Sequence, residues 1–272
     1  MVDSAITHYG LSERRACQLL QISRTAYRYQ AKLPTDNELR EALLTLAARQ
    51  PRWGVQKMID YLKNQRYGDL DETRSKWNHK RIRRVYRELG LNLRVKPKKR
   101  LPVREPQPLE VPNRTNVSWS LDFMHDSLAN GRPIRTVNIL DEFNREGLWI
   151  EVDTSLPAAR VVRILDTLAQ WRGYPQQLRI DNGPELISQT MSDWADEHGV
   201  MLAFIQPGKP AQNAFIERFN RTYREAVLDA YLFDTVAEAQ ALTEEWLEEY
   251  NAVRPHEALG GVPPYRYVRE QP

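Results

Sequence analysis

The sequence predicts an α/β protein in which a mixed five-stranded sheet with flanking helices follows an all-α region. Between residues 117 and 230 the hydrophobic periodicity gives three strands, a helix, a strand, a helix, a strand and a helix. A mixed sheet with helices packed on it satisfies that order. Residues 1–94 instead show helical periodicity interrupted by turn signals, which indicates a separate helical region.

Charge is divided between the same two regions. Residues 1–115 contain 25 Lys and Arg against 12 Asp and Glu, a net charge of +13, whereas residues 116–272 contain 14 against 24, a net charge of −10. The division indicates that the first half holds a polyanion and that the second has carboxylate chemistry of its own. Basic helices that merely face water are the alternative.

Length and cysteine content limit the class of protein. The 272 residues suit two or three domains. The single cysteine, Cys17, excludes an intrachain disulfide framework and a zinc site built on clustered cysteines. No signal peptide is recognisable, and no apolar run approaches the roughly 18 residues of a membrane span. We therefore expect a soluble, cytoplasmic protein.

Residues 1–32 are predicted to contain a helix-turn-helix segment. Ser12 can cap a first short helix and Ser23 a second, with a tight connection at Gln21. The second helix carries Arg24 and Arg28, as expected of a helix that reads DNA. Many helical hairpins share this outline without contacting DNA, so both interpretations stay open.

Residues 33–94 are predicted to form a second helical DNA-binding domain, with helices over Asp36–Ala48, Gly54–Lys63 and Trp77–Leu89. Six cationic or potentially cationic side chains surround the apolar stripe of the last helix. They repel each other unless a polyanion compensates them, which favours contact with DNA phosphates. The one histidine among them has no partner at metal-ligand spacing and is expected to be a surface residue. The six residues are His79, Lys80, Arg81, Arg83, Arg84 and Arg87.

Residues 95–116 lack apolar periodicity and contain five prolines, which predicts an extended linker between domains. The first third of this linker is basic. Its side chains either follow a DNA backbone or keep the linker solvated. Lys98 and Lys99 are the candidates for DNA contact.

Two aspartates occupy comparable places in the predicted sheet. Residues 117–124 alternate between apolar and polar, so Asp122 projects from the polar face of a half-exposed first strand. The fourth strand, residues 177–180, runs directly into the turn sequence that begins with Asp181. Taken singly, each aspartate is typical of a solvated strand or turn position. The other strands are predicted at 134–140, 148–153 and 200–205, and helices at 156–171 and 188–198.

A helix with two opposed faces is predicted over residues 210–230. One face is apolar and suits a core, whereas the other holds Glu217. An i,i+4 ion pair between Glu217 and Arg221 on a solvated face is the simpler interpretation. The two aspartates upstream favour a joint function of the three acids instead. The polar neighbours within about 60° of the glutamate are Asn213, Asn220, Arg221 and Arg224.

The last predicted helix covers residues 235–250 and begins with a capping box formed by Thr235 and Glu238. Residues 234–272 are expected to pack on the core as a C-terminal helix and tail, with His256 ordering the tail. Four more acids are expected on the surface, although they could support a carboxylate site. They are Asp126, Asp141, Glu142 and Glu185.

Three motifs together resemble the catalytic core of the retroviral-integrase superfamily, which has a ribonuclease H-like fold. They are W-S-L-D-F around Asp122, D-N-G-P-E from Asp181, and P-A-Q-N-A-F-I-E-R-F-N-R-T-Y-R, which contains Glu217. Thirty-five residues separate the last two acids, the spacing of that superfamily's Asp, Asp, Glu triad. The likeness covers about residues 116–267 and includes the tail Y-N-A-V-R-P-H-E-A-L-G-G-V-P-P. With its basic helical front, the chain is most similar to second-reading-frame (OrfB) transposases of bacterial insertion sequences.

The resemblance implies a core over residues 117–233 that cleaves the 3′ ends of an insertion sequence and transfers the freed 3′-OH into DNA. Asp122, Asp181 and Glu217 would hold two Mg²⁺ ions, for which Mn²⁺ can substitute. Arg224 matches the basic residue that follows the glutamate in these transposases and is a candidate for DNA contact. The other candidates beside the site are Arg221, Lys209 and Asn213.

The resemblance also bears on partners. Cutting and joining two DNA ends implies at least a homodimer on DNA, and the protein would be associated with the nucleoid when bound. Frameshift fusion to an upstream reading-frame product would add a further DNA-binding domain and a coiled coil. The alternative function is a non-catalytic DNA-binding regulator of transposition derived from a transposase.

Overall fold

The computed structural model describes residues 1–29, 36–64, 77–94, 109, 111–206 and 210–269. The chain forms two compact units, Met1–Ala42 and Leu43–Pro272. The finer division expected from the sequence, with boundaries at residues 32, 94, 116 and 233, stays a prediction. No helix among the described residues is long and apolar enough to cross a membrane.

The smaller unit begins with three short helices, and two of them start at the predicted caps. The Ser12 hydroxyl accepts a hydrogen bond from the Arg15 amide at 3.3 Å, and the Ser23 hydroxyl accepts one from the Ala26 amide at 3.0 Å. Each cap satisfies an amide that has no partner within its helix. The sequence pattern does not predict the first of the three helices. They are α1 (Val2–Tyr9), α2 (Glu13–Leu19) and α3 (Arg24–Tyr27).

Three longer helices follow close to their predicted positions: α4 (Asn37–Arg49), α5 (Val55–Asn64) and α6 (His79–Glu88). The side chain of Asn78 caps α6 by accepting a hydrogen bond from the Lys80 amide at 2.9 Å. The apolar stripe of α6 is buried as its periodicity predicts. The buried residues are Ile82, Val85 and Tyr86.

The larger unit contains the predicted mixed sheet of five strands. The order across the sheet is β3-β2-β1-β4-β5, so β1 is central. β1, β2 and β3 are antiparallel neighbours, whereas β4 runs parallel to β1, and β5 parallel to β4. The strands are β1 (Ser118–Ser127), β2 (Pro133–Asp141), β3 (Gly147–Asp153), β4 (Gln177–Ile180) and β5 (Met201–Phe204).

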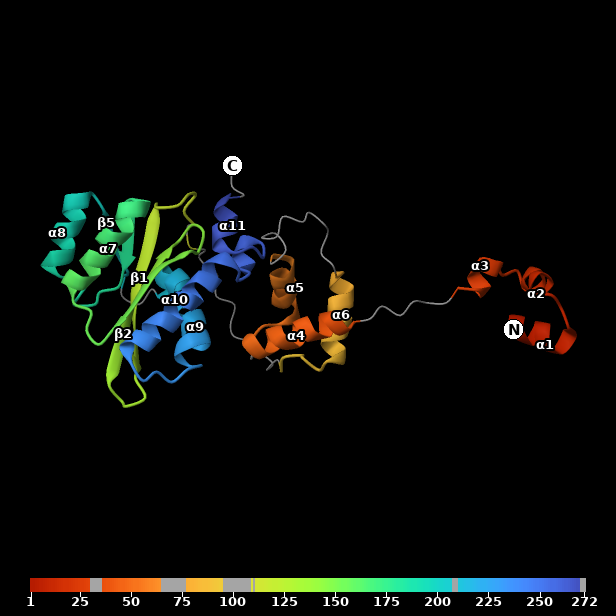
Figure 1. Cartoon of the computed structure of the whole chain (residues 1–272). Helices are drawn as coiled ribbons and strands as arrows, with labels where there is room; N and C mark the ends of the chain where they lie inside the picture. Colours follow the sequence, from red (N-terminus) through yellow and green to blue (C-terminus); the bar gives the residue numbers. More distant parts are fainter. Residues whose placement is uncertain (30–35, 65–76, 95–108, 110, 207–209, 270–272) are drawn as a thin grey trace, which may run out of the picture. The chain divides into compact units, whose positions relative to one another are not determined.

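Two pairs of helices cover the two faces of this sheet (Figure 1). α7 and α8 pack on one face, where Trp119 and Leu165 belong to one buried cluster. α9 and α10 pack on the other face, where Phe219 and Trp246 belong to a second cluster. This confirms the ribonuclease H-like arrangement of a mixed sheet with flanking helices. The four helices are α7 (Ala158–Arg172), α8 (Gln189–His198), α9 (Ala214–Tyr223) and α10 (Val236–Ala252).

The predicted helix over residues 210–230 is not continuous. It consists of a 3₁₀ turn at Pro210–Asn213, then α9, then a π-helix at Arg224–Leu228. A π-helix widens the turn and shifts the faces that follow it, which uniform 100° spacing cannot represent. The chain closes with a 3₁₀ turn at Glu257–Leu259 and with α11 (Pro264–Arg269).

The polar face of β1 is buried, although its alternation predicts a half-exposed strand. Ser118 and Ser120 are fully buried, and both hydroxyls donate to the carboxylate of Glu142. The Nε atom of Arg179, on β4, lies 2.9 Å from the same carboxylate. The surface position expected for Glu142 is therefore wrong. A buried carboxylate is tolerated where a cation and hydrogen-bond donors compensate it, and such partners are invisible in a strand's own pattern.

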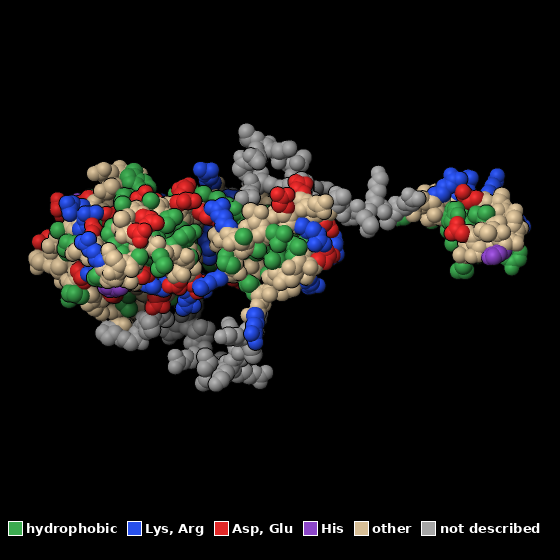
Figure 2. All heavy atoms as spheres, turned by 60° about the horizontal axis from the view of Figure 1, so that its bottom comes forward, with side chains coloured by type: hydrophobic (Ala, Val, Ile, Leu, Met, Phe, Trp, Pro, Cys, Tyr) green, Lys and Arg blue, Asp and Glu red, His purple; other side chains and the backbone are tan. Residues whose placement is uncertain are grey.

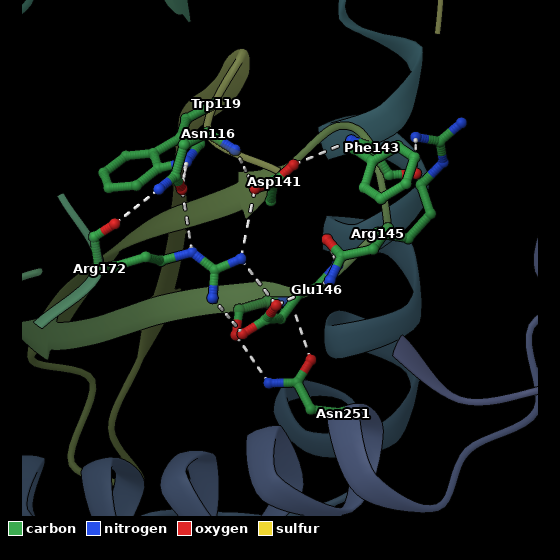
Figure 3. Close-up of polar contacts among 10 residues, drawn as sticks. Asn116, Trp119, Asp141, Phe143, Arg145, Glu146, Arg172 and Asn251 are labelled. Carbon is green, nitrogen blue, oxygen red and sulfur yellow. Dashed lines mark hydrogen bonds and ion pairs between the residues drawn. The ribbon is translucent and has the colours of Figure 1, made fainter. Parts of the chain in front are cut away.

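A second buried ionic network lies where β2 ends and α7 ends (Figure 3). The Arg172 guanidinium donates two hydrogen bonds to Glu146, at 2.7 and 2.8 Å, and one to Asp141 at 3.3 Å. Asn116 donates its backbone amide to Asp141 at 3.0 Å and its side-chain amide to the Arg172 carbonyl at 2.6 Å. Asp141 is fully buried, so its expected surface position is also wrong, and for the same reason.

Helices α9 and α10 approach the sheet closely at Gly147, at the start of β3. A Cβ atom there would lie 2.5 Å from Leu247 and 2.8 Å from Phe219. The Gly147 amide donates to the Asn251 side chain at 2.9 Å, and the Asn251 amide donates back to the Gly147 carbonyl at 2.8 Å. A larger residue would push both helices away from the sheet.

Replacing Arg172 by Met should destabilise the protein by about 3 kcal/mol or more, because the Asp141 and Glu146 carboxylates would stay buried without their cation. Urea unfolding followed by circular dichroism measures this loss. Arg160→Met is the matched control: Arg160 pairs with Glu151, but 38% of its side chain is exposed, so a loss below about 1 kcal/mol is expected. Equal losses in the two variants would contradict the importance of the buried network.

Candidate active site

Two of the predicted acids occupy neighbouring positions on the two central strands. β1 and β4 pair in parallel with Ser118 opposite Gln177 and Ser120 opposite Arg179. Two residues further along, the same register places Asp122 opposite Asp181, just beyond the end of β4. Neighbouring strands are about 4.8 Å apart, and residues at equivalent positions point to the same face. Strand pairing therefore brings together two acids that are far apart in the sequence.

Helix α9 brings Glu217 to the same end of the sheet. The side-chain amide of Asn220, on α9, donates to the Asp122 carboxylate at 2.8 Å. At the start of the helix, Arg179 of β4 donates to the backbone carbonyl of Gln212 at 3.0 Å. Both central strands thus hold α9 in place. Glu217 lies in the chain between these two attachments and is exposed to solvent.

A buried amide pair supports Asp122. Asn138 is the register partner of Asp122 on β2 and is fully buried. Its side-chain amide donates to the side-chain oxygen (Oδ1) of Asn220 at 2.6 Å, and the side-chain amide of Asn220 donates in turn to one oxygen of Asp122. The other oxygen of Asp122 accepts the Phe123 amide at 2.9 Å. A network in which each member is held by the next restricts rotation, so the fold sets the direction of the Asp122 carboxylate.

The three acids influence each other electrostatically. Burial first, and then the carboxylates of Asp181 and Glu217, raise the pKa of Asp122 to about 6, against hydrogen bonds from Phe123 and Asn220 that favour its charged form. Gathering like charges in a half-buried place is costly unless a cation compensates them. Perturbed carboxylates of this kind are typical of functional sites.

The donor set fits a hard divalent cation, because Mg²⁺ prefers carboxylate oxygens. Within the part of the chain that the structure describes, no group of three His, Cys, Asp or Glu side chains is close enough to enclose one ion. Asp181 instead accepts the Gly183 amide at 3.0 Å within its own turn. The assignment of two metal ions to these three carboxylates therefore stays a prediction.

Arg224, a predicted DNA-contact residue, is turned toward β1. Its guanidinium pairs with Asp126 at 3.2 Å and donates to the His125 carbonyl at 2.7 Å. Glu185 is likewise engaged, in an ion pair with Arg135 of β2 at 2.5 Å. Both acids are therefore occupied by cations and do not join the three carboxylates.

The remaining predicted contacts beside the site differ in exposure. Arg221 is exposed, and among the described residues it makes no ion pair with Glu217, so the simpler interpretation of that helix face finds no support. Asn213 is buried, and its carbonyl oxygen has no hydrogen-bond partner there. Lys209 lies outside the described residues.

The cations of α6 gather on one exposed face. Lys80, Arg83, Arg84 and Arg87 line one shallow hollow. Arg84 also pairs with Glu88, four residues on, at 2.6 Å. The other two candidates on this helix are His79, which is exposed, and Arg81, which is half-buried.

Four further residues predicted to contact DNA lie in the amino-terminal segment and the linker. Arg24 is exposed, whereas Arg28 is occupied by an ion pair with Glu13 at 2.9 Å. Lys98 and Lys99 lie outside the described residues. Their contacts with DNA stay predictions.

The family of the chain follows from comparison with known proteins. Two integrase core domain families match, over residues 112–210 and 198–264. The chain is 39% identical over 265 residues to the insertion element IS476 39.2 kDa protein of Xanthomonas euvesicatoria, covering 97% of this chain and 74% of that protein. It is 39% identical over 260 residues to the insertion element IS407 31.7 kDa protein of Burkholderia multivorans, covering 95% and 91%. The chain belongs to the insertion-sequence transposases.

Each acid of this transposase lies within an integrase core match. Asp122 and Asp181 fall in the first matched range and Glu217 in the second. Among solved structures, the simian T-cell lymphotropic virus intasome in complex with PP2A regulatory subunit B56 gamma has a TM-score of 0.49 and 15% identity, covering 72% of this chain and 68% of that one. A likeness at that level bears on neither activity nor residue roles.

Sequence reasoning singles out the three acids of the transposase but misses the residues that hold them. Asn138 and Arg179 receive no role from periodicity, although each is a polar side chain that precedes a fully buried isoleucine of the same strand, Ile139 or Ile180. A buried amide or guanidinium needs partners, so its presence in a central strand is a usable signal.

Asp122→Asn should raise the stability of the metal-free transposase at pH 8 by about 1–2 kcal/mol, because it removes a carboxylate that burial and like charges destabilise. With its pKa raised to about 6, folded Asp122 binds protons more readily than the unfolded chain does. The charged Asp122 carboxylate therefore destabilises the folded state fully above pH 6, and this destabilisation disappears as the pH falls toward 4.

Thermal unfolding in EDTA at about pH 8 and pH 4.5 measures this prediction, and the gain should shrink at the lower pH. Asp126→Asn is the control, since its carboxylate already has a cation, Arg224, and its loss should not stabilise. A gain of equal size at both pH values would refute the electrostatic explanation.

Proposed function

We propose that the chain is an active DNA transposase, which cleaves the 3′ ends of its insertion sequence and transfers the resulting 3′-OH into DNA. The single observation that carries this proposal is the grouping of Asp122, Asp181 and Glu217 at one end of the sheet, close enough to raise the pKa of Asp122. Membership of the transposase family supports it.

The three carboxylates would hold two Mg²⁺ ions, or Mn²⁺ in their place. When bound, such ions lower the pKa of a water or hydroxyl and stabilise the charge on phosphorus and on the leaving oxygen. The chain's own contribution is orientation. Asn220 and the Phe123 amide each hold one oxygen of Asp122, while Glu217 remains exposed and able to turn toward DNA.

DNA is the proposed partner of the helical region as well. Four exposed cations on one face of α6 suit a phosphate backbone. Acting on two DNA ends would require at least a dimer, formed by this chain alone or with the product of an upstream reading frame. A bacterial DNA substrate would place the protein in the cytoplasm, on the nucleoid.

A regulator that only binds DNA is the other candidate function. Such a protein has no use for three carboxylates that repel each other. The raised pKa of Asp122 is a cost that a bound cation would offset. We therefore favour the enzyme.

Glu217→Gln should abolish cleavage and strand transfer on a labelled insertion-sequence end in Mg²⁺ or Mn²⁺, with a loss of about 10³-fold or more, while DNA binding is retained. The amide keeps the size of the side chain but removes the charge that would hold a cation. Glu248→Gln, an exposed residue of α10, is the matched control and should leave activity unchanged. If the wild type binds DNA yet gives no product even beside its upstream partner, the regulator is the correct function.

Arg87→Gln on α6 should weaken DNA binding and lower the slope of log K against log salt by about one, because one phosphate contact is lost. Fluorescence anisotropy with a short duplex, between about 50 and 200 mM salt, measures the slope. Arg163→Gln removes one exposed charge from α7 and is the control. An identical slope in the wild type and the α6 variant would exclude this helix from the DNA interface.

A further inference from the structure

The larger unit contains a cleft of about 570 Å³ on the opposite side of α9 from β1. The segment that leads into α5 and α5 itself form one wall, while α9, α10 and the residue Arg254 form the other. Figure 2 shows Lys and Arg side chains, drawn in blue, among the exposed side chains of this unit. The cations that line the cleft are Arg49, Arg52, Lys57, Arg218, Arg221 and Arg254.

Only two of these six cations are neutralised by a carboxylate. Arg49 pairs with Glu249 at 2.8 Å, and Arg52 lies 3.4 Å from Glu225. Within the described part of the chain, the other four form no ion pair. The third acid of the lining, Glu245, is exposed. With six cations and three carboxylates in its lining, the cleft has an excess of positive charge.

Two of the four unpaired cations lie beside the same aromatic ring. The Lys57 ammonium lies 5.7 Å from the centre of the Trp53 ring, and the Arg254 guanidinium carbon lies 5.5 Å from the same centre. Burial, and then the charges of Arg254 and Arg218, lower the pKa of Lys57 to about 8. A surface that gathers more cations than carboxylates is stabilised when an anion enters, as phosphate-binding surfaces are.

The cleft adjoins the candidate active site through α9. Glu217 and Arg218 are consecutive residues, so their side chains point about 100° apart on the helix. Asn220, on the side of Glu217, contacts Asp122, whereas Arg218 and Thr222 line the cleft. The exposed Arg221 falls between the two sides. A polyanion lying in the cleft would therefore reach the three carboxylates along a cationic path.

We propose that this cleft binds the phosphate backbone of the DNA on which the transposase acts, through Lys57, Arg218 and Arg254. The inference rests on the proposed function for the identity of the anion, while the charge excess of the cleft is independent of it. A phosphodiester and free inorganic phosphate offer the same chemistry. A cleft of this volume, with cations along both walls, suits a row of phosphates better than a single one.

A lysine footprint on the full-length protein tests the site directly. Because its pKa is about 8, Lys57 should react with a water-soluble acylating ester faster at that pH than Lys63, an exposed lysine on the same helix. A duplex of mixed sequence should slow acylation of Lys57 by about tenfold and leave Lys63 unchanged, read by mass spectrometry. Inorganic phosphate at the same ionic strength should protect neither.

A binding measurement with an exposed residue avoids the risk of misfolding. In a Glu217→Gln background, where no DNA is cut, Arg218→Gln should weaken duplex binding by about fivefold to tenfold and lower the salt slope by about one. Lys57→Arg, which keeps the charge, should bind within about twofold of its parent. Arg163→Gln on α7 is the matched control for loss of one charge.

The outcomes separate the inference from the function on which it rests. If duplex DNA binds but does not protect Lys57, and Arg218→Gln leaves the slope of log K against log salt unchanged, the cleft is not a DNA site. The transposase proposal would still stand. Equal protection by inorganic phosphate would overturn the DNA assignment in favour of a free-phosphate site. A chain that binds no DNA at all would overturn both.

Discussion

The parallel pairing of β1 with β4 is the constraint on which the candidate site depends. It alone brings Asp122 and Asp181 to the same face, and a slip of one residue would turn one of them to the opposite face. The buried contacts just before the acids prevent such a slip. Ser120 and Arg179 are opposite each other in the register, and both contact Glu142. The polar ladder therefore specifies strand register, a role for which an apolar ladder would be less selective.

Helix α9 combines three tasks on three of its sides. Phe219 belongs to the core beneath the sheet, Asn220 holds Asp122, and Arg218 lines the basic cleft. Since an α-helix repeats every 3.6 residues, these sides are fixed relative to one another as soon as the helix is anchored. The two amides of Asn138 and Asn220 and the Arg179 contact to Gln212 supply that anchoring. Packing, carboxylate geometry and cationic surface thus cannot be adjusted independently.

Much of this architecture is predictable from the sequence because strands and helices with one buried face carry a clear period. All five strands, the main helices around them and the three acids follow from spacing and motif. Periodicity cannot show which hydrogen-bond or ionic partner a polar side chain has. Ser118 and Ser120 occupy positions that the alternation predicts to face solvent. Both are buried, because their hydroxyls donate hydrogen bonds to Glu142. The changes of helix type at Asn213 and after Tyr223 are likewise absent from a uniform helical period.

The Arg172 network has a consequence for how this protein can change over generations. Arg172 lies on α7, Asp141 on β2 and Glu146 in the loop between β2 and β3, and replacing any one of them alone leaves an uncompensated charge in the interior. An apolar solution of equal volume exists in principle, but every single-step route to it passes through a variant that folds poorly. Neutral mutations can accumulate in the loops and surfaces around Arg172, Glu146 and Asp141, whereas these three residues can change only together.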